Sequence, residues 1–126
     1  MTEARTIRVV LVEDNEVFRE SLEVVLGLEP DIDVVGAVEG GHDGIALCAR
    51  ERPRVALVDY RLPDLDGVAT TRAIRAASPA TVVVALTAGA DEPQLAALLE
   101  AGAATCLRKD LAVADIVAAI RKSAKA

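Results

Sequence analysis

The chain has 126 residues, a length that suits a single domain over residues 1–126, and 52% of them are hydrophobic. A net charge of −6 excludes a protein that grips nucleic acid through a basic patch, so we expect no direct nucleic-acid contact by this segment. No run approaches the roughly 20 apolar residues of a membrane span, and Cys48 and Cys106 lack C-x-x-C spacing. We therefore expect a cytoplasmic protein with free thiols and no membrane contact.

The first two units of the chain each combine a short β-rich run with a helical stretch. Residues 6–12, "TIRVVLV", predict a strand, and residues 15–29 predict a helix with Asn15 as its N-cap. Residues 31–38, "DIDVVGAV", predict the second strand. Residues 41–52 predict the second helix, whose buried face would hold Ile45, Cys48 and Ala49.

The middle of the chain repeats this alternation with more strongly apolar strands. Residues 54–59, "RVALVD", predict a third strand that ends on an acid. Residues 66–78 predict a third helix, with Asp66 as a candidate N-cap. Residues 81–87, "TVVVALT", form the most continuously apolar run and predict the fourth strand.

The last part of the chain completes the pattern. Residues 91–102 predict a fourth helix with an apolar stripe of Leu95, Leu98 and Leu99. Residues 104–108, "ATCLR", predict a weaker fifth strand, and residues 110–126 predict the last helix. Apolar strands that alternate with amphipathic helices are typical of a parallel sheet covered on both faces. Because crossovers are right-handed, we expect an α/β, doubly wound (βα)5 fold of flavodoxin type with strand order 2-1-3-4-5.

Polar side chains follow the predicted strands at the edge where such sheets bind ligands, next to the switch point between strands 1 and 3. They are Glu13, Asp14, Asp59, Thr87 and Lys109. Three carboxylates that lie close together repel one another unless a cation joins them, and an all-oxygen cluster suits Mg²⁺. The sequence therefore predicts a magnesium site at this edge of the sheet.

The same set of side chains fits phosphoryl transfer. A metal ion and the Lys109 ammonium would neutralise the phosphoryl oxygens, and the Thr87 hydroxyl could donate to one of them. A carboxylate can act as the nucleophile and form an acyl phosphate. Asp59 ends the central strand and is the natural acceptor, with Glu13 and Asp14 as metal-binding residues.

At these spacings the motifs resemble the receiver domains of two-component response regulators over essentially the whole chain. "VLVEDNEVFRESL" is similar to the family's opening acid pair, and "VALVDYRLPDLDGV" is similar to its phosphoacceptor strand and loop. "VVVALTAGAD" and "EAGAATCLRKD" resemble its switch-threonine and lysine segments. In its first half the chain looks like receivers that precede a helix-turn-helix output domain.

The resemblance implies a role for each site residue. Asp59 would be the phosphorylated aspartate, and it would bind Mg²⁺ directly together with Asp14 and the backbone carbonyl of Arg61. Glu13 would act through a metal-bound water. The residues that would contact the phosphoryl group are Thr87 and Lys109.

The resemblance also implies partners and an output. A histidine kinase, a phosphotransfer protein or a small acyl phosphate would supply the phosphoryl group. Phosphorylation would switch the surface of the fourth helix, fifth strand and fifth helix, which would engage a homodimer mate or a fused output domain and so control transcription. The chain would then be no enzyme beyond its own phosphorylation and dephosphorylation.

One position departs from the family pattern. Three residues before Lys109, where the family usually has an aromatic switch residue, this chain has Cys106. Two readings stay open for it: a small apolar filler at a partner surface, or a redox-sensitive thiol.

A phosphorylation-independent interaction domain on the same fold is the alternative function. A dehalogenase-like phosphatase is disfavoured, because it needs a second acid two residues after the nucleophile, where this chain has Arg61.

Overall fold

A computed structural model describes residues 6–89 and 91–125. Within them five strands alternate with five helices. The strands are β1 (Ile7–Val12), β2 (Ile32–Val38), β3 (Val55–Asp59), β4 (Val82–Thr87) and β5 (Ala103–Arg108). The helices are α1 (Glu16–Gly27), α2 (Gly41–Glu51), α3 (Gly67–Ala77), α4 (Glu92–Ala101) and α5 (Val113–Ala124).

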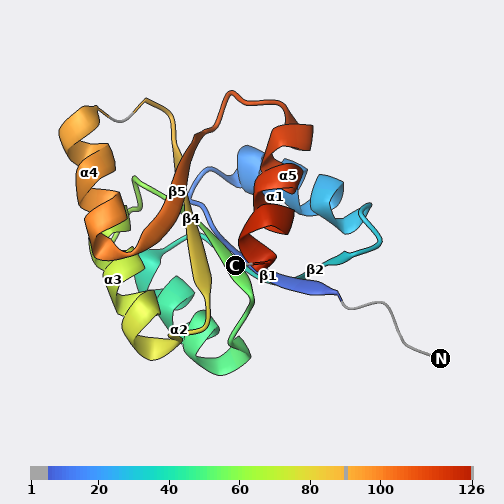
Figure 1. Cartoon of the computed structure of the whole chain (residues 1–126), viewed down its shortest axis with the longest axis horizontal. Helices are drawn as coiled ribbons and strands as arrows, with labels where there is room; N and C mark the ends of the chain where they lie inside the picture. Colours follow the sequence, from blue (N-terminus) through green and yellow to red (C-terminus); the bar gives the residue numbers. More distant parts are fainter. Residues whose placement is uncertain (1–5, 90, 126) are drawn as a thin grey trace.

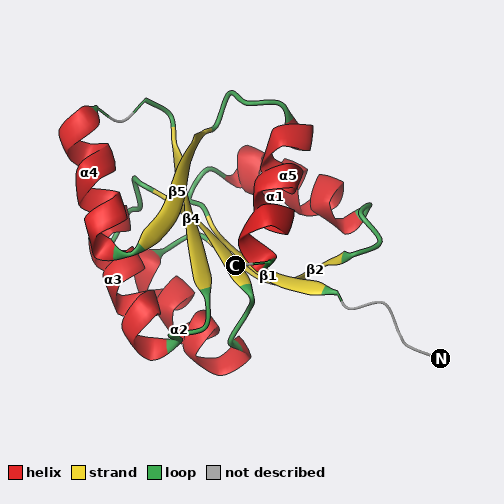
Figure 2. Cartoon of the chain, in the orientation of Figure 1, coloured by secondary structure: helices red, strands yellow, loops and turns green. Residues whose placement is uncertain are grey.

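All five strands run parallel in the order β2-β1-β3-β4-β5, which confirms the predicted doubly wound topology. In the registered pairs, Val12 lies opposite Val58, and Thr87 lies opposite Arg108. The carboxyl ends of the central strands therefore lie at one edge of the sheet. α1 and α5 cover one face, and α2, α3 and α4 cover the other (Figures 1 and 2).

The hydrophobic core consists of two aliphatic layers, one on each face of the sheet. Because successive strand residues point to opposite faces, neighbours in β1 belong to different layers. Val9 and Leu11 pack with Leu22 and Leu26 of α1 and with the buried face of α5. On the other face, the core contains Val10 and Val12 of β1 with Leu47, Cys48, Ile74 and Leu98.

Two of the predicted helix starts coincide with side-chain caps. The Asn15 side chain accepts a hydrogen bond from the Phe18 N–H, and the Asp66 side chain accepts one from the Ala69 N–H. Such caps satisfy backbone donors that a helix start leaves unpaired. Both N-cap predictions are confirmed.

The last helix begins three residues later than predicted. α5 starts at Val113, because residues 108–111 form a turn in which the Leu111 N–H donates to the Arg108 carbonyl. The Asp110 carboxylate is held by the Arg108 guanidinium and does not cap the helix. The final residue, 126, lies outside the described residues.

Cys48 and Cys106 are free thiols. Burial raises the pKa of the Cys48 thiol in α2 to about 12, so it remains protonated and behaves as a small apolar side chain. Among the described residues, no helix combines the length and the apolar character that crossing a bilayer requires.

Candidate functional site

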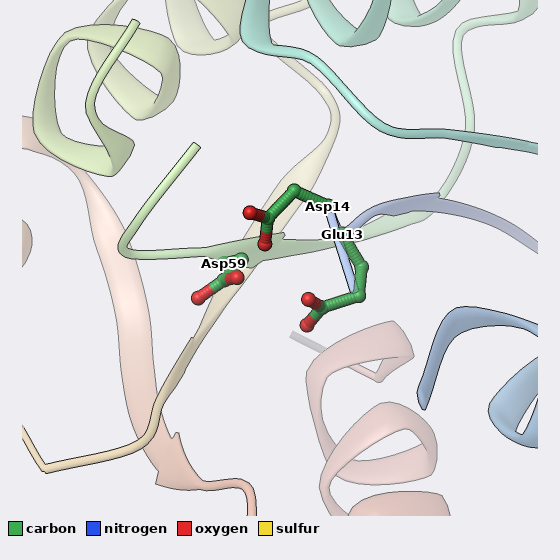
Figure 3. Close-up of side chains that lie close together, drawn as sticks. All are labelled: Glu13, Asp14 and Asp59. Carbon is green, nitrogen blue, oxygen red and sulfur yellow. The ribbon is translucent and has the colours of Figure 1, made fainter. Parts of the chain in front are cut away.

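Three carboxylates lie together at the carboxyl edge of the sheet. Glu13 and Asp14 follow β1, and Asp59 ends β3 (Figure 3). One oxygen from each lies within 4.8 Å of the others. Glu13 and Asp59 are buried, with exposed fractions of 1% and 3%, whereas Asp14 is exposed. The predicted acid cluster is therefore formed.

The Lys109 ammonium connects two of these acids. Its Nζ lies 2.7 Å from Glu13 Oε1 and 3.0 Å from Asp59 Oδ2. Burial alone would lower the pKa of Lys109, but its hydrogen bonds to Glu13 and Asp59 and their charges together raise it. Lys109 therefore supplies a fixed positive charge beside the Asp59 carboxylate.

Asp59 is the most perturbed acid of the cluster. Burial raises the pKa of its carboxyl to about 7, and the neighbouring Glu13 carboxylate adds to the rise. The hydrogen bond from Lys109 opposes it, as does the bond from the Arg61 N–H to Oδ1, at 3.2 Å. One ammonium does not compensate three carboxylates, so the site retains an affinity for a further cation.

Three residues that the sequence reasoning did not assign to the site support Glu13 and Lys109. The Asn15 N–H donates to Glu13 Oε2 at 3.0 Å, and the Arg19 guanidinium donates to the Glu13 carbonyl at 2.8 Å. The Phe18 ring lies beneath the Lys109 Nζ, with 5.1 Å to its centroid, which is a cation–π distance. An N-cap residue and an aromatic or basic side chain in the first turns of a helix have common local explanations, so the sequence held no signal for these contacts.

A glycine lets the loop after β3 fold closely around the site. A Cβ atom at Gly67 would lie 2.7 Å from the Asp59 carbonyl oxygen and 2.7 Å from Tyr60 Cα. The Gly67 N–H also donates to the Tyr60 carbonyl at 2.8 Å. The first turn of α3 is thus packed directly against the end of β3.

Thr87 and Arg61 line the same cleft as the acids. The cleft has a volume of about 490 Å³, and its lining includes Asp14, Asp59 and Lys109. Thr87 is buried at the end of β4, and its carbonyl accepts a hydrogen bond from the Lys109 N–H at 2.8 Å. The structure therefore places every predicted site residue except Cys106 at this one edge.

Cys106 lies in a neighbouring cavity. This cavity, of about 350 Å³, is lined by Thr87, Gly89, Leu95, Cys106 and Arg108. The Cys106 side chain is half-buried, and burial raises the pKa of its thiol. A raised pKa disfavours the reactive thiolate, so the arrangement favours the apolar-filler reading of Cys106.

The donor set fits a hard divalent cation. Mg²⁺ prefers oxygen ligands and takes one or two protein carboxylates while it keeps several waters. The cluster offers three carboxylates beside an open cleft that Arg61 also lines. No nitrogen or sulfur ligand is present in this described cluster, which distinguishes it from a zinc site.

The parallel 2-1-3-4-5 sheet, with an acid, threonine and lysine cluster at its carboxyl edge, defines a doubly wound α/β protein with a candidate cation site at the switch point. The chain belongs to the response regulator receiver domain family, whose model matches residues 9–121. The receiver domain of the response regulator NarL from Mycobacterium tuberculosis has a TM-score of 0.92 and 34% identity to this chain. The match covers 96% of this chain and 98% of that one.

Two curated relatives are longer proteins. The transcriptional regulatory protein LiaR of Bacillus subtilis is 34% identical over 119 residues, which cover 94% of this chain and 56% of LiaR. A protein-glutamate methylesterase of Methanospirillum hungatei is 38% identical over 111 residues, which cover 86% of this chain and 32% of that protein. The chain thus spans about half or less of the length of these relatives.

Proposed function

We propose that this receiver accepts a phosphoryl group on Asp59. The observation that carries the proposal is the position of the Asp59 carboxylate, which is buried at the end of the central strand with the Lys109 ammonium 3.0 Å from Oδ2. A buried acid with a fixed cation and an adjoining open cleft is typical of a functional carboxylate, since a purely structural acid needs no access to solvent.

The proposed reaction is a transfer to a carboxylate oxygen. An Asp59 oxygen attacks the phosphorus of a phosphohistidine or a small acyl phosphate. The new P–O bond forms as the P–N or P–O bond of the donor breaks. A phosphohistidine whose second ring nitrogen carries a proton leaves as neutral imidazole, and an acyl phosphate leaves as a carboxylate. Lys109 stabilises the charge on the phosphoryl oxygens, and the Thr87 hydroxyl donates to one of them.

Magnesium is the proposed cofactor. Asp14, Asp59 and the Arg61 carbonyl would hold it directly, and Glu13 would hold it through a water molecule. When bound, the ion neutralises charge on the transferred group. The three-carboxylate cluster and the raised pKa of Asp59 support this assignment.

The family supports a proposal for the wider role. We propose a histidine kinase or phosphotransfer protein as the donor, and a homodimer mate or fused output domain as the receiver of the signal. LiaR is a transcriptional regulatory protein, which supports control of transcription, whereas the methylesterase relative indicates that other outputs occur on similar receivers. The chain itself would catalyse only its own phosphorylation and dephosphorylation, in the cytoplasm, where its thiols stay free.

Intact-mass measurement after incubation with acetyl phosphate and Mg²⁺ tests the proposal. We expect a gain of one phosphoryl group, which chelation of Mg²⁺ or the Asp59→Asn substitution abolishes. Asp66→Asn is the matched control, because Asp66 lies on the same loop but only caps α3. An equal gain in Asp59→Asn would show that another residue accepts the phosphoryl group and would contradict the proposal. No gain in the wild type would favour the phosphorylation-independent interaction domain.

A further inference from the structure

Helix α2 takes its N-terminal cap from a distant loop. Asp64, between β3 and α3, accepts a hydrogen bond from the Gly41 N–H on Oδ1 at 2.7 Å and from the His42 N–H on Oδ2 at 3.0 Å. The helix's own N-cap residue, Gly40, has no side chain to make such a bond. α1, α3 and α4 are instead capped by their own adjoining residues, Asn15, Asp66 and Asp91.

The contact between the loop and α2 is also tight. A Cβ atom at Gly41 would lie 2.5 Å from Thr70 Oγ1 and 2.9 Å from Leu65 Cβ. A Cβ atom at Gly40 would lie 3.2 Å from each Asp64 carboxylate oxygen. The start of α2 therefore packs directly on the loop and on α3.

The loop that Asp64 ties down is the one that carries Arg61. Its start is held by the Tyr60 N–H, which donates to the Leu86 carbonyl, and its end by the Gly67 N–H, which donates to the Tyr60 carbonyl. Between these points, Leu62 packs against the core layer under α2 and α3, and Asp64 makes its two bonds to α2. Asp64 is thus the polar anchor of the middle of the loop.

The charge of Asp64 is stabilised by α2, and Asp64 does not belong to the described acid cluster that could hold a metal ion. Its side chain is exposed, yet both oxygens accept backbone N–H groups at the positive end of a helix dipole. These hydrogen bonds, from His42 and Gly41, lower the pKa of the Asp64 carboxyl. The Asp64 carboxylate therefore stays ionised at neutral pH and keeps both hydrogen bonds to α2.

We propose that Asp64 is a positioning residue for the metal site: by tying the loop to α2 it holds the Arg61 carbonyl where Mg²⁺ can use it. The inference rests on the proposed function, because it assumes that Mg²⁺ binds at Glu13, Asp14 and Asp59. Groups that orient metal ligands from outside the ligand set commonly change metal affinity by about 10- to 100-fold when they are removed. Asp64 would set the Mg²⁺ affinity without touching the ion.

The test separates capping of α2 from positioning of the loop. Asp64→Ala removes both. Adding Gly40→Ser restores a cap to α2, since residue 40 has the extended backbone of an N-cap, φ −120° and ψ 157°, and the missing carboxylate leaves room for the new side chain. We would measure the Mg²⁺ dissociation constant of unphosphorylated protein by calorimetry and the order of α2 by amide hydrogen exchange.

The proposal predicts about tenfold weaker Mg²⁺ binding in Asp64→Ala, and equally weak binding in Asp64→Ala/Gly40→Ser although α2 exchange returns to the wild-type rate. If Asp64→Ala does not fold, Asp64→Asn, which keeps one acceptor oxygen, should show an intermediate loss. Asp91→Ala removes the cap of α4 and should leave Mg²⁺ affinity unchanged. Wild-type affinity in Asp64→Ala, or its recovery in the double variant, would overturn the inference.

Failure of the metal site gives a different result. If the wild-type protein itself binds no Mg²⁺, the proposed function is contradicted and the role of Asp64 falls with it. If the wild-type protein binds Mg²⁺ and is phosphorylated but the Asp64 variants bind the ion equally well, only the inference about Asp64 is wrong.

Discussion

Asp59 carries a charge that the folded protein stabilises only in part. The carboxyl is buried and lies near Glu13, and one hydrogen bond from Lys109 does not offset both effects, so its pKa rises to about 7. A group with this property destabilises the metal-free fold at neutral pH. Because a bound cation compensates this charge, the same property makes the free energy of cation binding at the site more favourable.

A pH-dependent stability difference follows at Asp59. The unfolded carboxyl has a pKa near 3.8 and the folded one near 7, so between these values the folded state retains a proton that the unfolded state has lost. The free energy of unfolding of the metal-free wild type therefore falls as pH rises through this window, while that of Asp59→Asn lacks this term. We expect Asp59→Asn to be more stable at about pH 8 by on the order of a few kcal/mol, and by less at about pH 5.

Urea denaturation in the presence of a chelator measures this difference. Adding Mg²⁺ should stabilise the wild type and narrow the gap, because the ion compensates the charge. Asp66→Asn should change little at either pH, since an asparagine oxygen can also accept the Ala69 N–H. A gap that does not change with pH would show that Asp59 is not the titrating group.

Arg121 joins helix α5 to the loop between α1 and β2. The Arg121 guanidinium makes two hydrogen bonds of 2.8 Å to the Asp31 carboxylate and one of 2.7 Å to Glu29. The hydrogen bond from Arg121 lowers the pKa of the Asp31 carboxyl, against a smaller opposing effect of burial. This bidentate pair fixes α5 beside α1, on the face that both helices cover (Figure 1).

The lowered pKa of Asp31 defines the pH range in which its ion pair with Arg121 stabilises the fold. Its contribution to stability is fully present above the unfolded pKa of 3.8 and is lost as pH falls through the lower folded value. We expect Arg121→Gln to cause only a small loss of stability at about pH 6, because the ion pair is partly exposed. The loss should shrink near pH 3, because Asp31 becomes protonated. The urea midpoints of Arg121→Gln and of Lys122→Gln, a substitution at an exposed neighbour, would be compared at both pH values. An equal loss at both pH values would assign the effect to packing of the arginine stem.

The elements also show which features a sequence reveals and which it does not. Strand order, both N-caps and the acid cluster follow from local periodicity and from the edge geometry of parallel sheets. Leu99, predicted for the buried stripe of α4, is 51% exposed, and Leu47 rather than Ala49 is buried in α2. Helix phase depends on the angle at which each helix docks, which the spacing alone does not specify.

Contacts between residues far apart in the sequence could not be predicted either. The bond from Asp64 to α2 spans 23 residues, and the Phe18 ring meets Lys109 from a different element. An acid in a turn and an aromatic on a helix have common local explanations, so their partners appear only in three dimensions. Lys109, by contrast, could be predicted because it follows a strand that ends at the shared edge.

At the scale of the whole molecule, the site is continuous with the side formed by α4 and β5. The Lys109 N–H donates to the Thr87 carbonyl, which joins the ends of β4 and β5. Thr87 also lines the cavity that contains Leu95 of α4 and Cys106 of β5. Because both cavities share Thr87, a displacement of this residue toward a phosphoryl group would reach α4 and β5 even without an aromatic at position 106.

Beryllofluoride, a phosphoryl mimic, tests this coupling by NMR. With Mg²⁺ present, we expect amide shift changes that extend from the cleft to α4, β5 and the start of α5. The opposite end of the sheet, where Arg52 and Pro53 line another cavity, should change little. Thr87→Ala should confine the changes to the cleft. Changes confined to the cleft in the wild type would contradict coupling through Thr87.

Direct mapping of the modification tests most directly whether Asp59 is the phosphorylated residue. The protein would be phosphorylated with acetyl phosphate and Mg²⁺, treated with borohydride, which reduces an aspartyl phosphate to homoserine, and digested for peptide mass spectrometry. If Asp59 is the phosphorylated residue, homoserine is expected at position 59 and at no other acid. Homoserine at Asp14, Asp64 or Asp66 instead, or none after a measured gain in intact mass, would contradict it.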